Sequence, residues 1–91
     1  HPGEVEAALR SLPGVRDAVA LGIADPVRGQ ALGVVLQSDG AWDARTVREA
    51  LSSQLAPYKL PRAVLVVPTL PLTDRGKVDR AALLRLLERR H

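Results

Sequence analysis

A single lysine in the C-terminal third has the clearest chemical potential in this chain. Lys77 follows Gly76 at the end of the polar segment 71–77, which lies between an apolar stretch and a leucine-rich one. A lysine ammonium is a compact charge on a flexible stem, and glycine lets the adjacent backbone bend without steric cost. Such a lysine can reach a phosphate or carboxylate outside its own domain. We therefore take Lys77 as the candidate catalytic residue and Gly76 as a residue that sets the loop conformation.

Few other residue types here could carry chemistry. The chain has no cysteine, and its two histidines are the first and last residues. A disulfide framework and a cysteine-ligated metal site are therefore excluded, and we expect no metal site. The Gly-Lys pair is not a Walker A loop, because Pro71 stands where the first glycine belongs and Val78 replaces the Ser or Thr. We interpret Thr73 and Asp74 as residues that shape the loop.

Charge is distributed unevenly along the 91 residues. The net charge is +3, but residues 1–58 carry five basic and seven acidic side chains, whereas residues 59–91 carry eight basic and three acidic ones. This excess suits an anionic partner. Trp42 and Tyr58 are the only aromatic residues, so the stacking surfaces of single-strand binders are missing. A discrete phosphate-bearing ligand explains the charge better than nucleic acid does.

Composition and termini suggest one domain taken from a longer polypeptide. The hydrophobic fraction of 46% is normal for a globular chain, and 91 residues suffice for one small core. The chain contains no methionine and begins with His1-Pro2, so we interpret it as a fragment. No apolar run could span a bilayer, and no signal peptide is apparent. We expect a cytoplasmic location.

Hydrophobic periodicity predicts six elements of secondary structure in the order α-β-β-α-β-α. The predicted helices are 4–12, a segment from Asp43 to Leu55 and a C-terminal segment capped by Asp79; the predicted strands are 15–24, 31–37 and 63–67. The first two strands should pair antiparallel because only a short turn separates them. We expect an α+β fold: a single small domain with a three-stranded mixed sheet flanked by helices.

Two residue patterns refine this expectation. Bulky residues alternate with alanine and glycine along 15–24, which predicts one bulky face and one smooth face that a helix can approach closely. The valine-rich apolar run 63–67 indicates a buried strand. Pro57 and Pro61 bracket an irregular piece that contains Tyr58 and Lys59.

With this order of elements, the chain resembles the small C-terminal subdomain of the adenylate-forming superfamily. This superfamily contains acyl-CoA synthetases, the adenylation domains of nonribosomal peptide synthetases, and luciferases. The resemblance rests on six short motifs that occur in the same order as in that family. They lie at 2–6, 13–18, 22–29, 55–61, 70–73 and 76–80.

The resemblance implies a two-step ligase in which this domain, residues 1–91, is a mobile lid. A carboxylic acid attacks the α-phosphate of ATP, and a thiol from CoA or a carrier-protein pantetheine then attacks the acyl-adenylate. Lys77 would contact ATP and the acyl-adenylate in the first step and leave for the second. The large N-terminal domain, absent here, would bind ATP, Mg²⁺ and the acid, so this fragment alone should be inactive and bind no cofactor.

Several alternatives follow from the same resemblance. An acyl-CoA synthetase, with a role in fatty acid metabolism, is the first interpretation; a peptide-synthetase adenylation domain that loads a carrier protein is the second. Lys77 also resembles the site at which acetylation silences some acyl-CoA synthetases. Arg28 is interpreted as a solvated turn residue, with contact to a CoA phosphate as the alternative. Arg80 is either a solvated residue at a helix start or a docking contact to the large domain.

A function of another class is a freestanding basic module that binds nucleic acid or an acidic protein. This hypothesis uses only the charge of the C-terminal third, which carries five more basic than acidic side chains. It predicts steeply salt-dependent binding by these 91 residues alone. The low aromatic content and the missing methionine argue against it.

Overall fold

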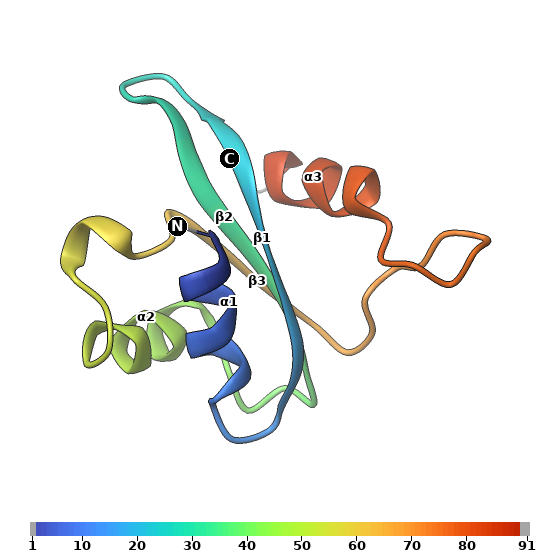
Figure 1. Ribbon diagram of the computed structural model, residues 1–91, viewed down its shortest axis with the longest axis horizontal. Helices are drawn as coiled ribbons and strands as arrows, with labels where there is room; N and C mark the ends of the chain where they lie inside the picture. Colours follow the sequence, from blue (N-terminus) through green and yellow to red (C-terminus); the bar gives the residue numbers. More distant parts are fainter. Residues whose placement is uncertain (1, 90–91) are drawn as a thin grey trace.

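The computed structural model describes residues 2–89, and its elements follow the predicted α-β-β-α-β-α order (Figure 1). The elements are α1 (Pro2–Arg10), β1 (Val15–Asp25), β2 (Gly29–Ser38), α2 (Ala44–Ser52), the short 3-10 helix η1 (Pro57–Lys59), β3 (Ala63–Val67) and α3 (Arg80–Arg89). The predicted α+β class is confirmed.

The three strands form one mixed sheet in the order β1-β2-β3. A tight turn joins β1 to β2 as an antiparallel pair, and Gly29 begins β2 with φ of +81°. The β2–β3 pair is parallel; such a pair needs a crossover connection, which α2 and η1 provide. The mixed sheet is therefore confirmed as predicted.

The prediction that 63–67 is a buried strand holds for Ala63 and Val64, which are 6% and 3% exposed. This strand, β3, lies at an edge of the sheet, and Leu65, Val66 and Val67 are only half-buried. A run of apolar residues indicates that both faces of a strand are covered. It does not indicate whether the strand has a neighbour on each side in the sheet, because the path of the chain determines the strand order.

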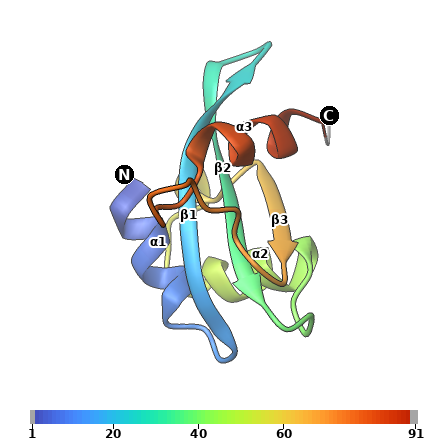
Figure 2. The same ribbon diagram turned by 90° about the vertical axis from the view of Figure 1, so that its right-hand side faces the viewer.

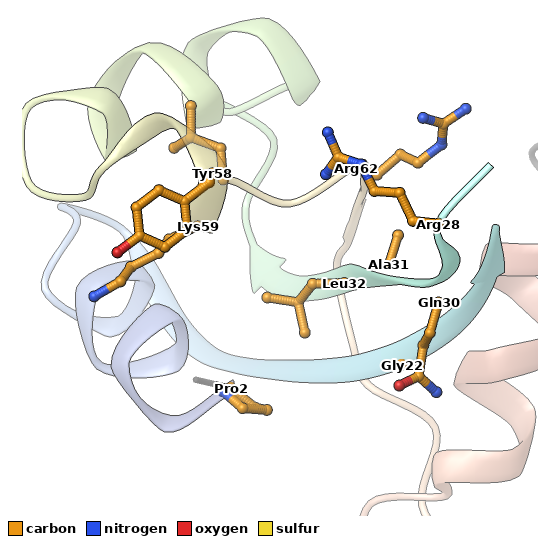
Figure 3. Close-up of a pocket in the computed structure, with 10 residues that line it drawn as sticks. Pro2, Gly22, Arg28, Gln30, Ala31, Leu32, Tyr58, Lys59 and Arg62 are labelled. Atoms are coloured by element: carbon orange, nitrogen blue, oxygen red, sulfur yellow. The ribbon is translucent and has the colours of Figure 1, made fainter.

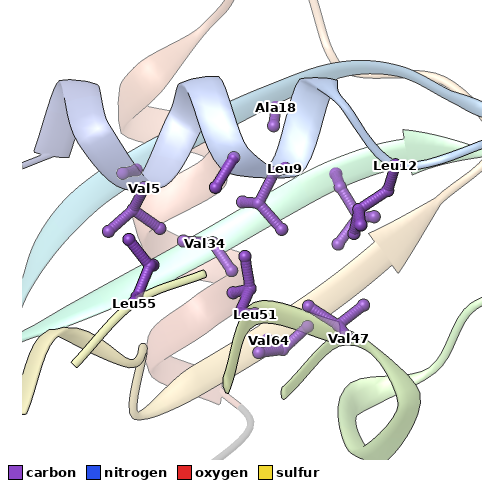
Figure 4. Packing of buried hydrophobic residues seen from close by; sticks show 12 residues of the cluster. Val5, Leu9, Leu12, Ala18, Val34, Val47, Leu51, Leu55 and Val64 are labelled. Carbon is purple, nitrogen blue, oxygen red and sulfur yellow. The ribbon is translucent and has the colours of Figure 1, made fainter. Parts of the chain in front are cut away.

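The sheet is covered on both faces, as Figures 1 and 2 show: α1 and α2 pack on one side and α3 on the other. The first core, drawn in Figure 4, joins α1 and α2 to the sheet through residues that include Val5, Leu9, Ala18, Val34 and Leu51. The second core joins α3 to the opposite face. Its members are Val19, Leu21, Ile23, Val35, Ala63, Leu70, Leu83 and Leu87.

Alternation along β1 explains how one strand serves both cores. Ala18 and Ala20 lie in the core beneath α1, whereas Val19 and Leu21 belong to the core beneath α3. Successive side chains of a strand point to opposite faces. The predicted smooth face is thus confirmed as the surface on which α1 lies.

Helix α1 ends two residues earlier than predicted and α2 ends three residues earlier, although their apolar residues remain buried. Helix α2 begins after Asp43, whose side chain accepts the N–H of Thr46 at 2.9 Å while Thr46 completes a capping box. The predicted cap is therefore confirmed. Leu12 and Leu55 lie beyond the ends of α1 and α2 yet are 8% exposed. Burial depends on the position of a side chain relative to the core and does not require a continuing helical hydrogen bond.

We expect Leu9→Ala to lower the free energy of unfolding by about 2–5 kcal/mol, because it leaves a cavity at a fully buried position. Urea denaturation of the domain measures this change. Leu72→Ala is the matched control, since the Leu72 side chain is 58% exposed and its loss should cost about 0.5 kcal/mol or less. Equal losses in both variants would contradict the assignment of this core.

Candidate functional site

Lys77 lies in a small closed hairpin, residues 71–79, which we call the lysine loop. Leu72 and Val78 form an isolated antiparallel bridge at its base. The N–H of Thr73 donates to the carbonyl of Lys77 at 2.7 Å, and the N–H of Gly76 donates to the carbonyl of Thr73 at 2.9 Å. The segment is therefore ordered by its own hydrogen bonds.

Gly76 provides the conformation on which the turn depends. Its φ is +81°, in the left-handed region that strains residues with a Cβ atom. No heavy atom lies within 4 Å of the position that a Cβ would occupy. Backbone conformation, and not lack of space, thus favours glycine immediately before Lys77.

The lysine loop is anchored to the body of the domain at both ends. Leu70, just before it, is 3% exposed in the α3 core, and its N–H donates to Gln37 Oε1 at 3.2 Å. At the other end, Asp79 Oδ1 accepts the N–H of Ala82 at 3.0 Å, which confirms Asp79 as the cap of α3. The half-buried Val78 packs against the same core.

Arg80 adds a contact that neither sequence interpretation anticipated. Its Nη2 donates to the carbonyl oxygen of Ala20 on the outer edge of β1 at 3.2 Å, and Glu6 Oε2 accepts the N–H of Ala20 at 2.7 Å. The two side chains replace a missing neighbouring strand at this point. Arg80 therefore ties the end of the lysine loop to the sheet.

The Lys77 side chain itself is exposed. Within residues 2–89, no carboxylate forms an ion pair with it. The neighbouring Asp74 and Arg75 are also exposed, so the loop presents two positive charges and one negative charge to a partner.

A pocket of about 500 Å³ lies on the side of the sheet that α1 and α2 cover, away from the lysine loop (Figure 3). It is lined by the β1–β2 hairpin, η1 and the segment that enters β3. Its lining residues are Pro2, Gly22, Arg28, Gln30, Ala31, Leu32, Tyr58, Lys59, Leu60 and Arg62. Three of these are cations, so the pocket suits an anionic ligand.

Asp25 organises two of the pocket's cations from beneath. Its Oδ1 accepts the N–H groups of Val27 and Arg28 at 2.8 and 3.0 Å, and its Oδ2 lies 3.3 Å from Nε of Arg62. The contact with Arg62 is an ion pair without the alignment of a hydrogen bond. The main-chain N–H of Arg28 has the largest effect on the pKa of Asp25 and lowers it, and the N–H of Val27 lowers it as well. Burial raises this pKa, whereas the charge of Arg62 lowers it further.

Lys59 is held by a different carboxylate. Its Nζ lies 2.9 Å from Oε1 of Glu4 on α1, and this hydrogen bond raises the pKa of Lys59. The ion pair joins η1 to the first helix. Lys59 thus has a structural partner, whereas the Arg28 side chain extends from an exposed turn.

Sequence reasoning identified the lysine loop and Arg28 but missed Arg62. Asp25 and Arg62 are 37 positions apart in the chain, and only the parallel pairing of β3 with β2 brings them together. The turn-forming type of Asp25 was the available signal. No local pattern marks its ion-pair partner.

In the part of the chain that the structure describes, no group of three or more His, Cys, Asp or Glu side chains could hold a metal ion. Among the same residues, no helix is both long and apolar enough to cross a membrane.

We expect Asp25→Asn to destabilise the domain at neutral pH and to matter less in acid. Asn keeps an oxygen acceptor for the turn but removes the charge beside Arg62. Because the folded pKa of Asp25 lies below its ordinary value of 3.8, the stability that its charge provides is complete above 3.8 and disappears as the pH falls through the folded pKa. Unfolding free energies from pH 7 to pH 2 measure this gap.

Asp39→Asn controls for the change in net charge, because it removes a carboxylate whose ion pair with Arg16, at 3.5 Å, is exposed and contributes little to stability. Asp43, whose pKa is also lowered, mainly by the N–H of Thr46, keeps its contribution in both variants. A gap between wild type and Asp25→Asn that stays constant with pH would contradict the assigned role of Asp25.

Comparisons with known proteins identify the family of this chain. The family described as AMP-binding enzyme C-terminal domain matches residues 4–77. The chain is 42% identical over 83 residues to a salicylyl-CoA synthase / salicylate adenylyltransferase of a Streptomyces species, covering 88% of this chain and 15% of that protein. It is 40% identical over 85 residues to a probable non-canonical nonribosomal peptide synthetase of Salinispora arenicola. This match covers 91% of this chain and 1% of that protein.

A solved structure adds agreement in three dimensions. ATP-bound MatB from Rhodopseudomonas palustris superposes with a TM-score of 0.83 at 28% identity, over 94% of this chain and 18% of that one. The chain therefore spans less than a fifth of each of these three proteins. The matched family and the shared fold together show that this chain belongs to the AMP-binding enzyme C-terminal domain family, the C-terminal subdomain of adenylate-forming enzymes.

Proposed function

We propose that this domain is the lid of an AMP-forming ligase that joins a carboxylic acid to a thiol, most closely an acyl-CoA synthetase. One observation carries the proposal. An exposed lysine belongs to the closed loop that precedes α3, on the α3 side of the sheet (Figure 1), and a cationic pocket lies beside α1 and η1 on the other side (Figure 3). The two half-reactions of such an enzyme need different groups at one active site. A domain with two chemically different sides can supply them in turn.

In the first half-reaction Lys77 would act as an electrostatic stabiliser. The carboxylate oxygen attacks the α-phosphorus of ATP, and pyrophosphate leaves with the electrons of the broken P–O bond. Two anions must approach each other, and charge develops on the phosphoryl oxygens. The ammonium of Lys77 offsets this repulsion, while the large domain of the enzyme would bind ATP, Mg²⁺ and the acid.

The order of the lysine loop suggests how Lys77 would leave the active site. The loop is closed by its own hydrogen bonds and anchored by Leu70 and Arg80. Withdrawal of the lysine would therefore come from rotation of the whole domain, and not from opening of the loop. The same rotation would bring the opposite side of the sheet toward the acyl-adenylate.

The pocket beneath α1 and η1 favours CoA as the thiol donor. CoA carries a diphosphate and a ribose phosphate, and guanidinium groups bind phosphate oxygens well. Arg28 and Arg62 both line this pocket. A carrier protein presents its pantetheine on a single phosphodiester, so it needs fewer cations near the thiol.

Exposure of Lys77 also makes it accessible to a protein acetyltransferase. Acetylation removes the positive charge of lysine. A ligase modified at this position would lose the stabilising charge for adenylation while its remaining loop contacts stayed in place. We include this modification in the proposal as a means of inactivation.

In the full-length enzyme, Lys77→Ala should slow adenylation by roughly 10²–10³-fold, the usual effect of removing one electrostatic stabiliser. Thioester formation from supplied acyl-adenylate should continue, because Lys77 has left the active site by then. Pyrophosphate release and single-turnover thioester formation measure the two steps separately.

Arg75→Ala is the matched control, since Arg75 is another exposed cation of the same loop. It should change either rate by less than about threefold, the effect of a weakly coupled exposed charge. Equal losses of both half-reactions in Lys77→Ala would contradict the lid proposal, and so would an unaffected adenylation rate.

Arg28→Ala and Arg62→Ala test the choice of thiol donor. If CoA binds in the pocket, each variant should raise the KM for CoA by about tenfold, corresponding to one lost charge-assisted hydrogen bond. The adenylation rate should not change. An unchanged KM for CoA together with efficient loading of a carrier protein would favour the peptide-synthetase alternative.

A further inference from the structure

Thr73 forms four hydrogen bonds with residues 75–77. Its hydroxyl Oγ1 accepts the N–H groups of Arg75 and Lys77, each at 3.3 Å. Its main-chain N–H donates to the carbonyl of Lys77 at 2.7 Å, and its carbonyl accepts the N–H of Gly76 at 2.9 Å. Both peptide groups of Lys77 are thus held by one residue.

Main-chain contacts close the base of the loop, and the hydroxyl acts at its tip. Leu72 and Val78 form a bridge at the base, and the N–H of Asp79 donates to the carbonyl of Pro71 at 2.8 Å. At the tip, Gly76 next to Lys77 has φ of +81°. Glycine has more conformational freedom than any other residue, so its conformation must be selected by its neighbours. Two N–H groups that share one hydroxyl acceptor close the turn around it.

We propose that Thr73 is a positioning residue for the adenylation step: its hydroxyl fixes the backbone of Lys77 before substrates meet. A catalytic charge accelerates a reaction most when no reorganisation is needed at the moment of reaction. The direction in which the lysine side chain leaves the loop is set by its backbone, which Thr73 holds on both sides. This inference rests on the proposed function of Lys77.

Substitution of Thr73 by valine or by serine distinguishes the role of the hydroxyl from that of the methyl group. Valine keeps the branched shape and removes the acceptor, whereas serine keeps the acceptor and removes the methyl group. Thr73 is exposed, so neither change disturbs a buried core. Thr69→Val is the matched control, because Thr69 is an exposed threonine just outside the loop and its hydroxyl makes none of these contacts.

The test measures both half-reactions in the full-length ligase for Thr73→Val, Thr73→Ser, Thr69→Val and Lys77→Ala. We expect Thr73→Val to slow adenylation about tenfold, in line with the loss of one well-placed hydrogen-bond acceptor. Thioester formation from supplied acyl-adenylate should be unchanged, and Thr73→Ser should restore adenylation to within about twofold of wild type. Thr69→Val should leave both steps intact.

Three results would overturn the inference while leaving the role of Lys77 in place: normal adenylation in Thr73→Val, a serine variant as slow as the valine variant, or a parallel loss of both steps. Normal adenylation in Lys77→Ala would instead overturn the proposed function, and the role of Thr73 with it. The ratio of the two half-reaction rates separates positioning from a general loss of folded enzyme, which lowers both.

Discussion

Burial of both faces of a three-stranded sheet is the constraint on which the rest of this domain depends. Each strand must offer apolar side chains in both directions, and β1 does so by alternating alanine with larger residues. Helices α1 and α2 therefore cover one face and α3 covers the other. Because the connections emerge on both sides, the lysine loop and the cationic pocket are separated by the full thickness of the sheet.

This separation links the fold to the chemistry that we propose. A residue needed in one half-reaction and a surface needed in the other cannot occupy the same active site together. The internal hydrogen bonds of the lysine loop, with the contact of Arg80 to β1, make the domain a single unit from Lys77 to the pocket. Rotation of such a unit moves both features at once.

The fold decides which basic side chains of the C-terminal third find partners within the domain. Its excess of basic side chains suggested one anionic partner. In the structure, Lys59 pairs with Glu4, Arg62 pairs with Asp25, and Arg80 binds a backbone carbonyl. Part of the basic excess is therefore used within the domain. Of the remaining cations that the structure describes, Arg75 and Lys77 lie on the lysine loop, and Arg85 and Arg89 lie on α3.

The sequence alone determined those features that depend on interactions between neighbouring residues. Caps at Asp43 and Asp79, the alternation along β1 and the order of elements could all be predicted, because each depends on residues near one another in the sequence. Only the tertiary structure decided that β3 is an edge strand and that Arg62 meets Asp25. Strand order and ion pairs between distant segments depend on the path of the chain in space, which periodicity and motif spacing do not contain.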